Sequence, residues 1–379
     1  TGAWREAAGG LLMSTSHHYK ADATALERPD LLAGREPRTI NMSTIGDDLL
    51  RDSSPAFGPK VEAVIVYNSN PVAVAPEGDK VRRGFARDDL FTVVLEHFQT
   101  DTADYADYLL PATTQLEHVD VHKSYGHRYW LANNAAVAPL GEAKSNTRIF
   151  RELAAHMGFD DPCFRDSDDD LASQAIAPDA RNGGITWDTL HDCGWAKVPG
   201  AAALFAEGGF TTPSGKCEFW SQREADAGRD PLPSVLLPYE CTESTPELAA
   251  RFPLAMISPP ARNFLNSTFV NVDSLRASEG EPLLLIHPDD AATRGIAEGQ
   301  MVRTFNDRGA TQSRARISTR TRPGMVVGMG IWWRKLSPDG NNVNAVTHQR
   351  LTDLGGGACF YDCLVEVRPT DTSTPQDGR

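Results

Sequence analysis

Polar side chains follow two apolar segments of the chain, at the points where those segments end. Residues 61–67 are followed by Asn68 and Asn70, and residues 90–95 are followed by Glu96. An asparagine amide offers a paired donor and acceptor, and a carboxylate accepts hydrogen bonds from the N–H groups of guanine. An amide and an acid at neighbouring strand ends would therefore suit a purine nucleotide. The alternative is turn chemistry alone, because Asn-Pro is a common loop former.

These side chains share a site only if the two segments pair in one sheet. Residues 61–67 and 90–95 have the length and the β-branched composition of buried strands, and 76–86 between them predicts a helix. Residues 106–111 supply a third apolar segment, and 146–157 predicts an amphipathic helix. Strands that alternate with helices are typical of a parallel α/β sheet, whose ligands bind beyond the carboxyl ends of the strands.

The pattern changes to closely spaced strands after a proline-rich stretch at residues 231–250. The predicted strands are 254–257, 283–286, 301–306, 314–317, 325–328 and 363–367. Their spacing is typical of a compact β-barrel. We therefore predict the class α/β plus β-barrel, with an α/β domain over 1–240, a barrel domain over 250–369 and a disordered tail over 370–379.

Composition excludes several classes of partner. The 379 residues include 37 Lys and Arg against 51 Asp and Glu, which gives a net charge of −14. Such an acidic chain argues against nucleic acid or an anionic membrane as the main partner. No apolar run approaches the roughly 20 residues of a membrane span, so we predict no direct membrane insertion. The first residue is Thr1 rather than Met, so the missing secretory signal says little about the compartment.

No motif of a self-contained active site is present. The sequence has no nucleophile elbow, no phosphate-binding P-loop and no G-x-G-x-x-G turn. Its six cysteines are scattered, and the C-x3-C pair Cys359 and Cys363 does not match a zinc or redox spacing. We therefore predict free thiols and no metal ligand within this chain, and these motifs identify no catalytic residue.

Several short motifs nevertheless resemble, in the same order, the molybdopterin oxidoreductases of the dimethyl sulfoxide reductase superfamily. The resemblance covers almost all of residues 1–368. The motifs are Asn70-Pro71, Ala106-Asp107-x-Leu109-Leu110-Pro111, Pro139-x-Gly141-Glu142-Ala143-Lys144, Thr212-Pro213-Ser214-Gly215-Lys216 and His287-Pro288-x2-Ala291-x3-Gly295-Ile296-x2-Gly299.

The resemblance implies the C-terminal portion of a catalytic subunit, with a double-psi-type six-stranded barrel. The cofactor would be bis-molybdopterin guanine dinucleotide with molybdenum or tungsten. The metal ligand and a 4Fe-4S cluster would precede Thr1, so this chain alone should be inactive. The intact protein, with an electron-transfer partner subunit, would carry out two-electron redox chemistry on a small-molecule substrate such as formate or nitrate. Between compartments, a cytoplasmic location is favoured over a periplasmic one.

Two other functions stay open. One is a non-catalytic electron-transfer or scaffold subunit of the same fold, as in the large subunit of respiratory NADH dehydrogenase. The other is a free-standing guanine-nucleotide-binding module.

The resemblance assigns twelve residues to the cofactor. Five of them depart from the family pattern or lie only near it: Glu96 stands for Asp, His118 for Lys, Asn146 for Asp, Ser258 for Thr, and Tyr361 lies near a family Lys. The usual T-G-R is replaced by Ser258 and two prolines, so that Arg262 would supply the charge. The twelve are Asn68, Asn70, Leu95, Glu96, His118, Asn146, Ser258, Arg262, Asn266, Ser267, Asn344 and Tyr361.

Overall fold

A computed structural model of the chain describes residues 2–370, except for Ala8, Leu12, Met13, residues 15–17, Ser124, Ala201, Ala202 and Leu204. The chain forms two compact units. The first unit consists of Thr1–Pro37 and Pro111–Val235; the second, here the barrel unit, consists of Arg38–Leu110 and Leu236–Arg379. The domain limits 1–240 and 250–369 stay a prediction, and the predicted tail lies, from residue 371 on, outside the described residues.

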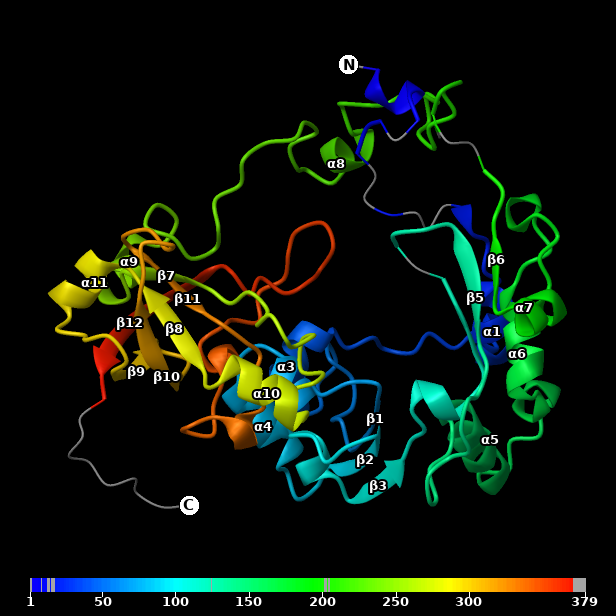
Figure 1. Cartoon of the computed structure of the whole chain (residues 1–379), viewed down its shortest axis with the longest axis horizontal. Coiled ribbons are helices and arrows are strands. Elements are labelled where there is room, and N and C mark those ends of the chain that lie inside the picture. The colour runs from blue at the N-terminus through cyan, green and yellow to red at the C-terminus, as the bar shows by residue number, and fades with distance from the viewer. Residues whose placement is uncertain are drawn as a thin grey trace. The chain divides into compact units, whose positions relative to one another are not determined.

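The barrel unit contains a small sheet ordered β1-β2-β3, formed by Ala63–Tyr67, Phe91–Glu96 and Tyr108–Pro111 (Figure 1). β1 and β2 are parallel, as the alternation of strands and helices predicted, and Tyr67 pairs with Leu95. Side chains on one face of β1 and β2 pack with two helices, α2 (Ile45–Leu50) and α4 (Gly78–Phe85). That apolar cluster fixes how the two strands lie, and so where their ends meet.

The Asn-Pro sequence after β1 begins a helix rather than an open turn. Pro71 is the first residue of α3 (Pro71–Val74), with Asn70 as its N-cap residue. Proline suits this position because its ring fixes a helical φ and the missing N–H would have no intrahelical partner. The helix expected over 76–86 is α4, and Glu77 precedes it with a φ of 50°.

Six strands close into a barrel in the order β10-β8-β11-β7-β12-β9. Some neighbours are parallel, such as β8 with β10, and others antiparallel, such as β9 with β10. The parallel sheet and the closed six-stranded barrel confirm the predicted fold class, whereas the double-psi connection stays a prediction. The strands are β7 (Leu254–Ile257), β8 (Leu283–Ile286), β9 (Met301–Phe305), β10 (Ala310–Ile317), β11 (Met325–Gly328) and β12 (Cys363–Pro369).

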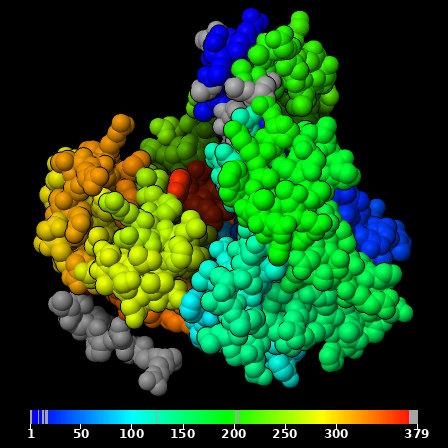
Figure 2. Space-filling model, turned by 45° about the vertical axis from the view of Figure 1, so that its right-hand side comes forward, coloured from blue at the N-terminus to red at the C-terminus, as the bar shows by residue number. Residues whose placement is uncertain are grey.

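Alternating side chains of these strands fill the barrel. Leu254, Met256, Leu284, Ile286 and Val302 are each at most 2% exposed. Period-two alternation of this kind places every second residue in the core. Three short helices flank the strands: α9 (Pro246–Arg251), α10 (Asp273–Glu279) and α11 (Pro288–Thr293). Figure 2 shows the yellow and orange atoms of the barrel and its loops as one continuous body.

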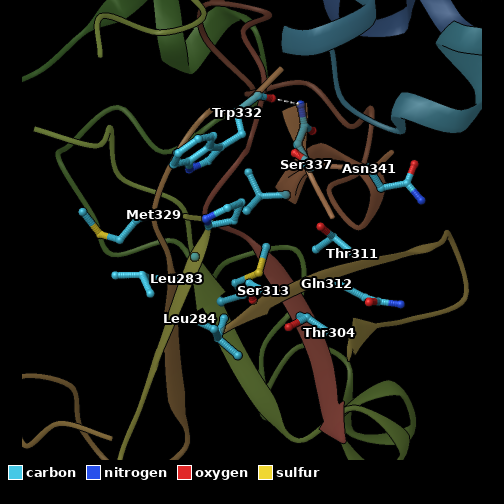
Figure 3. A pocket seen from close by; sticks show the side chains of 16 residues that line it. Leu283, Leu284, Thr304, Thr311, Gln312, Ser313, Met329, Trp332, Ser337 and Asn341 are labelled. Carbon is cyan, nitrogen blue, oxygen red and sulfur yellow. Dashed lines mark hydrogen bonds between the residues drawn. The ribbon is translucent and has the colours of Figure 1, made fainter. Parts of the chain in front are cut away.

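A small cavity lies at one end of the barrel, with Thr304, Thr311 and Ser313 on its wall (Figure 3). Its volume is about 20 Å³, which is room for about one water molecule. The Thr304 hydroxyl is buried and has no hydrogen-bond partner among the described residues. A water molecule in this cavity would satisfy it.

The first unit holds a second sheet that the sequence pattern did not predict. Its strands are β4 (Asp120–His122), β5 (Tyr129–Asn133) and β6 (Trp195–Lys197). β4 and β6 have only three residues each, too few for alternation to reveal, and tertiary packing around Trp130 and Trp187 forms the core of this sheet. The helices are α1 (Ala23–Glu27), α5 (Asn146–His156), α6 (Asp168–Ala175), α7 (Trp187–Cys193) and α8 (Gln222–Asp226); α5 matches the helix predicted at 146–157.

No helix in the described part of the chain is both long and apolar enough to span a bilayer.

Candidate functional site

The two polar strand ends lie at one edge of the β1-β2-β3 sheet. Because β1 and β2 are parallel and Tyr67 is opposite Leu95, the residues that follow each strand emerge on the same side. Asn68 has a φ of 53°, a left-handed conformation that asparagine tolerates. This edge therefore brings together Asn68, Asn70, Leu95 and Glu96, which the sequence had grouped.

Asn70 leaves a buried donor unused at this edge. Its side chain is buried, and its Oδ1 accepts hydrogen bonds from the backbone N–H (3.1 Å) and the hydroxyl (2.8 Å) of Thr102. The Asn70 Nδ2 is also buried, but no described residue accepts its hydrogens. Leaving such a group unpaired costs about 1–3 kcal/mol. An acceptor supplied by a ligand would remove that cost.

Glu96 provides the complementary acceptor. The residue is half-buried, and its Oε1 accepts a hydrogen bond of 2.8 Å from the backbone N–H of His97. Its Oε2 receives no hydrogen bond from any residue that the structure describes. Donor and acceptor at one edge match the purine chemistry proposed from the sequence, and Leu95 beside them is buried.

The segment from Ser258 to Ser267 follows β7 and precedes α10 in the chain. It contains four of the twelve residues that the resemblance assigns to the cofactor. The carbonyl of Ser267 accepts a 2.7 Å hydrogen bond from the indole N–H of Trp333, which anchors the loop's far end. Arg262 is exposed and forms no ion pair with a described residue, and Asn266 is exposed with a φ of 53°. The guanidinium of Arg262 is thus free to bind an anion, but its contact with the cofactor stays a prediction.

Asn344 links the segment that precedes β12 to α3 through side-chain hydrogen bonds. It is 1% exposed, and its Nδ2 donates to the carbonyls of Ala73 (3.2 Å) and Val74 (3.0 Å) at the end of α3. Asn342 also donates to Ala73 (3.0 Å) and to Trp332 (2.9 Å), the latter drawn as a dashed line in Figure 3. Both amide hydrogens of Asn344 are therefore occupied here, and its Oδ1, the one atom left for the predicted cofactor contact, already accepts from the Thr347 hydroxyl at 3.3 Å.

Asn344→Ala should lower the free energy of unfolding by about 1–3 kcal/mol, because the partly buried carbonyl of Val74 loses its hydrogen-bond donor. Urea-induced unfolding of the purified variant measures the change. Asn134→Ala removes an exposed asparagine of the first unit and serves as the control. Equal stability of the two variants would contradict the role of Asn344 as a support.

The remaining assigned residues are His118, Asn146 and Tyr361. In the first unit, His118 Nδ1 lies 2.9 Å from the Thr113 hydroxyl, and Asn146 is the first residue of α5 after its cap Ser145. Tyr361 belongs to the barrel unit and is 53% exposed. Their cofactor contacts stay predictions.

Two further polar side chains, which the sequence did not single out, follow Asn344 in the chain. His348 and Gln349 are 4% and 7% exposed, and the Nε2 atom of each is buried without a partner among the described residues. Gln349 Oε1 accepts from the backbone N–H of Asp47 at 3.2 Å. The sequence offers only one indication that these two residues belong to the site, which is that they directly follow the motif around Asn344. No helical or strand periodicity marks them as buried.

The surroundings of His348 lower its pKa. Burial is the largest cause; the charges of Arg308 and Arg350 act in the same direction, and Glu240 and Asp362 oppose them. The folded chain therefore binds this proton less well than the unfolded chain, whose histidine titrates near 6.5. The contribution of His348 to the free energy of unfolding should therefore be complete above pH 6.5, and it should decrease as the pH falls below that value.

His348→Gln should flatten this part of the stability profile, because glutamine does not titrate. Urea midpoints measured on both sides of pH 6.5 test it. His156→Gln, at an exposed position on α5, is the control and should keep the native profile. An unchanged acid slope in His348→Gln would contradict the prediction.

Two family models match this chain. The model described as "Molybdopterin oxidoreductase" matches residues 44–156, and the one described as "Molydopterin dinucleotide binding domain" matches residues 254–364. The chain belongs to the molybdopterin oxidoreductases. The second match spans the barrel, and the first includes β1, β2 and the edge that carries Asn70 and Glu96.

Individual relatives of this molybdopterin oxidoreductase chain agree. "Probable oxidoreductase YoaE" of Bacillus subtilis is 39% identical over 97% of the chain and 52% of its own length. A putative catalytic subunit of dimethyl sulfoxide reductase from Halobacterium salinarum is 30% identical over 93% of the chain and 42% of its own length. The solved acetylene hydratase from Pelobacter acetylenicus shares the fold, with a TM-score of 0.71 at 23% identity over 88% of the chain and 47% of that structure.

The molybdopterin oxidoreductase chain thus spans about half the length of the curated relatives it matches. Among the described residues, no group of three or more His, Cys, Asp or Glu side chains could hold a metal ion.

Proposed function

We propose that this chain is the cofactor-clamping portion of a longer molybdenum or tungsten oxidoreductase that binds bis-molybdopterin guanine dinucleotide. The observation that carries the proposal is the edge of β1 and β2, where the unpaired amide of Asn70 and the carboxylate of Glu96 emerge together. Guanine offers an acceptor for the first and N–H donors for the second.

The residues present fit the nucleotide end of this group. Burying an amide N–H2 without a partner is unfavourable, so the position of Asn70 is best explained by a ligand that accepts from it. The exposed guanidinium of Arg262 adds a cation suited to phosphate. When bound, the metal and its dithiolenes would supply the two-electron redox chemistry.

The chain's own part is to bind and orient. Thr102 fixes the amide of Asn70 through Oδ1, so the N–H2 group is directed away from Thr102. The hydrogen bonds of Asn342 and Asn344 fix α3, which begins directly after Asn70. A rigid support of this kind lowers the entropic cost of holding the nucleotide.

The substrate is proposed from the relatives alone. One of them is named for dimethyl sulfoxide reduction, so a small sulfoxide is the first substrate class to test. None of the relatives reported above is named for formate or nitrate, the substrates that the sequence suggested.

Three further features of the intact protein are also proposals. They are a 4Fe-4S cluster in the rest of the protein, an electron-transfer partner subunit, and a cytoplasmic rather than periplasmic location.

The two other functions make different predictions. A scaffold subunit of the same fold would contain no molybdenum or tungsten when purified from its host. A free-standing nucleotide module would bind guanosine diphosphate as the 379-residue chain alone, and the nucleotide would raise its melting temperature. The matches of two molybdopterin family models favour the cofactor-bound enzyme.

Metal analysis of the longer protein, purified from its host, tests the proposal directly. We expect molybdenum or tungsten, and guanosine monophosphate after acid hydrolysis, in a ratio of two nucleotides per metal because the cofactor is a bis-dinucleotide. A protein with neither metal would overturn the proposal.

A further inference from the structure

A second cavity lies on the outer wall of the barrel. Its volume is about 190 Å³, and it is lined by Leu283, Leu285, Met329, Trp332, Arg316 and Arg320, among others. Leu283 and Leu285 alternate along β8 with Leu284 and Ile286, which belong to the barrel core. Alternation directs the first pair away from the core, so this cavity lies outside it, and it shares Leu283, Met329 and Trp332 with the lining of the small cavity at the end of the barrel.

The wall of this outer cavity is apolar and fixed in place. Trp332 is 4% exposed, and its ring stands edge-on to Phe264 with centroids 5.1 Å apart. Figure 3 shows Trp332, Met329 and Leu283 along one side of the neighbouring interior cavity. The indole N–H of Trp332 has no acceptor among the described residues. A flat apolar ligand would therefore meet a preformed wall.

Two acids and two arginines line the outer cavity, and they differ in how they are paired. Glu279 keeps its charge, and its Oε1 accepts from the backbone N–H (2.6 Å) and the side chain (2.8 Å) of Asn263, whereas Glu281 pairs with Arg314. By contrast, Arg316 and Arg320 have no carboxylate within 4.0 Å in the part of the chain that the structure describes. Two unpaired guanidinium groups beside an apolar wall are complementary to an anion.

We propose that the outer cavity binds a small, flat organic anion, such as an aromatic carboxylate. An engineered cavity of about 150 Å³ holds benzene, so this volume accommodates one aromatic ring and its carboxylate. The ring would pack on Trp332 and Met329, and Arg316 and Arg320 would bind the carboxylate through paired hydrogen bonds. None of the twelve residues assigned to the cofactor lines the outer cavity, so this proposal does not rest on the proposed function.

A titration of the 379-residue chain with benzoate, followed by ligand-observed NMR, tests the proposal. For a ligand of this size we expect a dissociation constant on the order of 1 mM. Neutral benzyl alcohol and inorganic phosphate should each bind about tenfold more weakly, because each offers only half of the required chemistry.

The variant Arg316→Gln/Arg320→Gln should weaken benzoate binding by about tenfold or more. Both side chains are exposed, so the variant should fold normally. Arg322→Gln, at an exposed arginine that does not line the outer cavity, is the matched control and should bind benzoate as the native chain does. Absence of saturable benzoate binding, or equal affinity in the native and doubly substituted chains, would overturn the proposal.

Discussion

Replacing Glu240 by glutamine should destabilise the barrel unit by about 3–5 kcal/mol, the cost of leaving one partner of a buried ion pair alone. Glu240 is 7% exposed, and its two carboxylate oxygens accept from the guanidinium of Arg308 at 2.6 and 3.0 Å. The backbone N–H of Leu364 donates to the same carboxylate at 3.0 Å. Glu240 thus connects the segment that precedes the barrel to β12.

Urea-induced unfolding followed by tryptophan fluorescence measures this loss, with Trp332 and Trp333 reporting on the barrel unit and the five other tryptophans on the first unit. The double variant Glu240→Gln/Arg308→Met should recover much of the stability, because it removes both buried charges. Glu281→Gln breaks the exposed pair with Arg314 and should change little, because water screens that pair. If Glu240→Gln were as mild as Glu281→Gln, the buried pair would not be a support.

Glu96→Ala should weaken retention of the proposed cofactor by about 1.5–3 kcal/mol, which is the usual contribution of a hydrogen bond to a charged group. That free energy corresponds to a loss of affinity of about tenfold to more than a hundredfold. The reason is geometric: Glu96 closes β2 beside the end of β1, and its Oε2 has no partner among the described residues. Molybdenum content and bound guanine nucleotide of the longer protein, measured after dialysis, report the effect.

The matched control is Glu62→Ala. Glu62 is an exposed acid that precedes β1, so it lies at the opposite end of the same parallel sheet. The control variant has the same loss of charge and should keep its metal. Equal metal content in the two variants would contradict the guanine-binding role of Glu96.

Much of the barrel unit was predictable because its elements depend on local patterns. Runs of β-branched residues predicted β1 and β2, and the short, regular spacing of later strands predicted the barrel. Parallel pairing then requires that Asn70 and Glu96 emerge at one edge, as they do. The start of α3 at Pro71 was missed, because Asn-Pro is equally compatible with a turn and with the first residue of a helix.

The supports of the site were not predictable in the same way. Glu240 lies in a proline-rich stretch whose sequence indicates only a linker, yet its partner Arg308 is 68 residues away. Asn344 is a cofactor ligand by resemblance, whereas its amide hydrogens bind carbonyls of α3 some 270 residues earlier. Partners at such separations are chosen by packing, which no local period encodes.

By itself, the sequence determined the fold class, the family and the polar strand ends, because strand alternation, turn residues and short motifs are properties of neighbouring residues. Only the tertiary structure decided which of those polar groups remain available. In the folded chain the amide of Asn344 supports α3, whereas the Nδ2 of Asn70 remains without a described partner. Arg316 and Arg320 line the same cavity as Trp332. The physical reason is that a buried group is free or occupied according to what packs against it, and distant parts of the chain supply those neighbours.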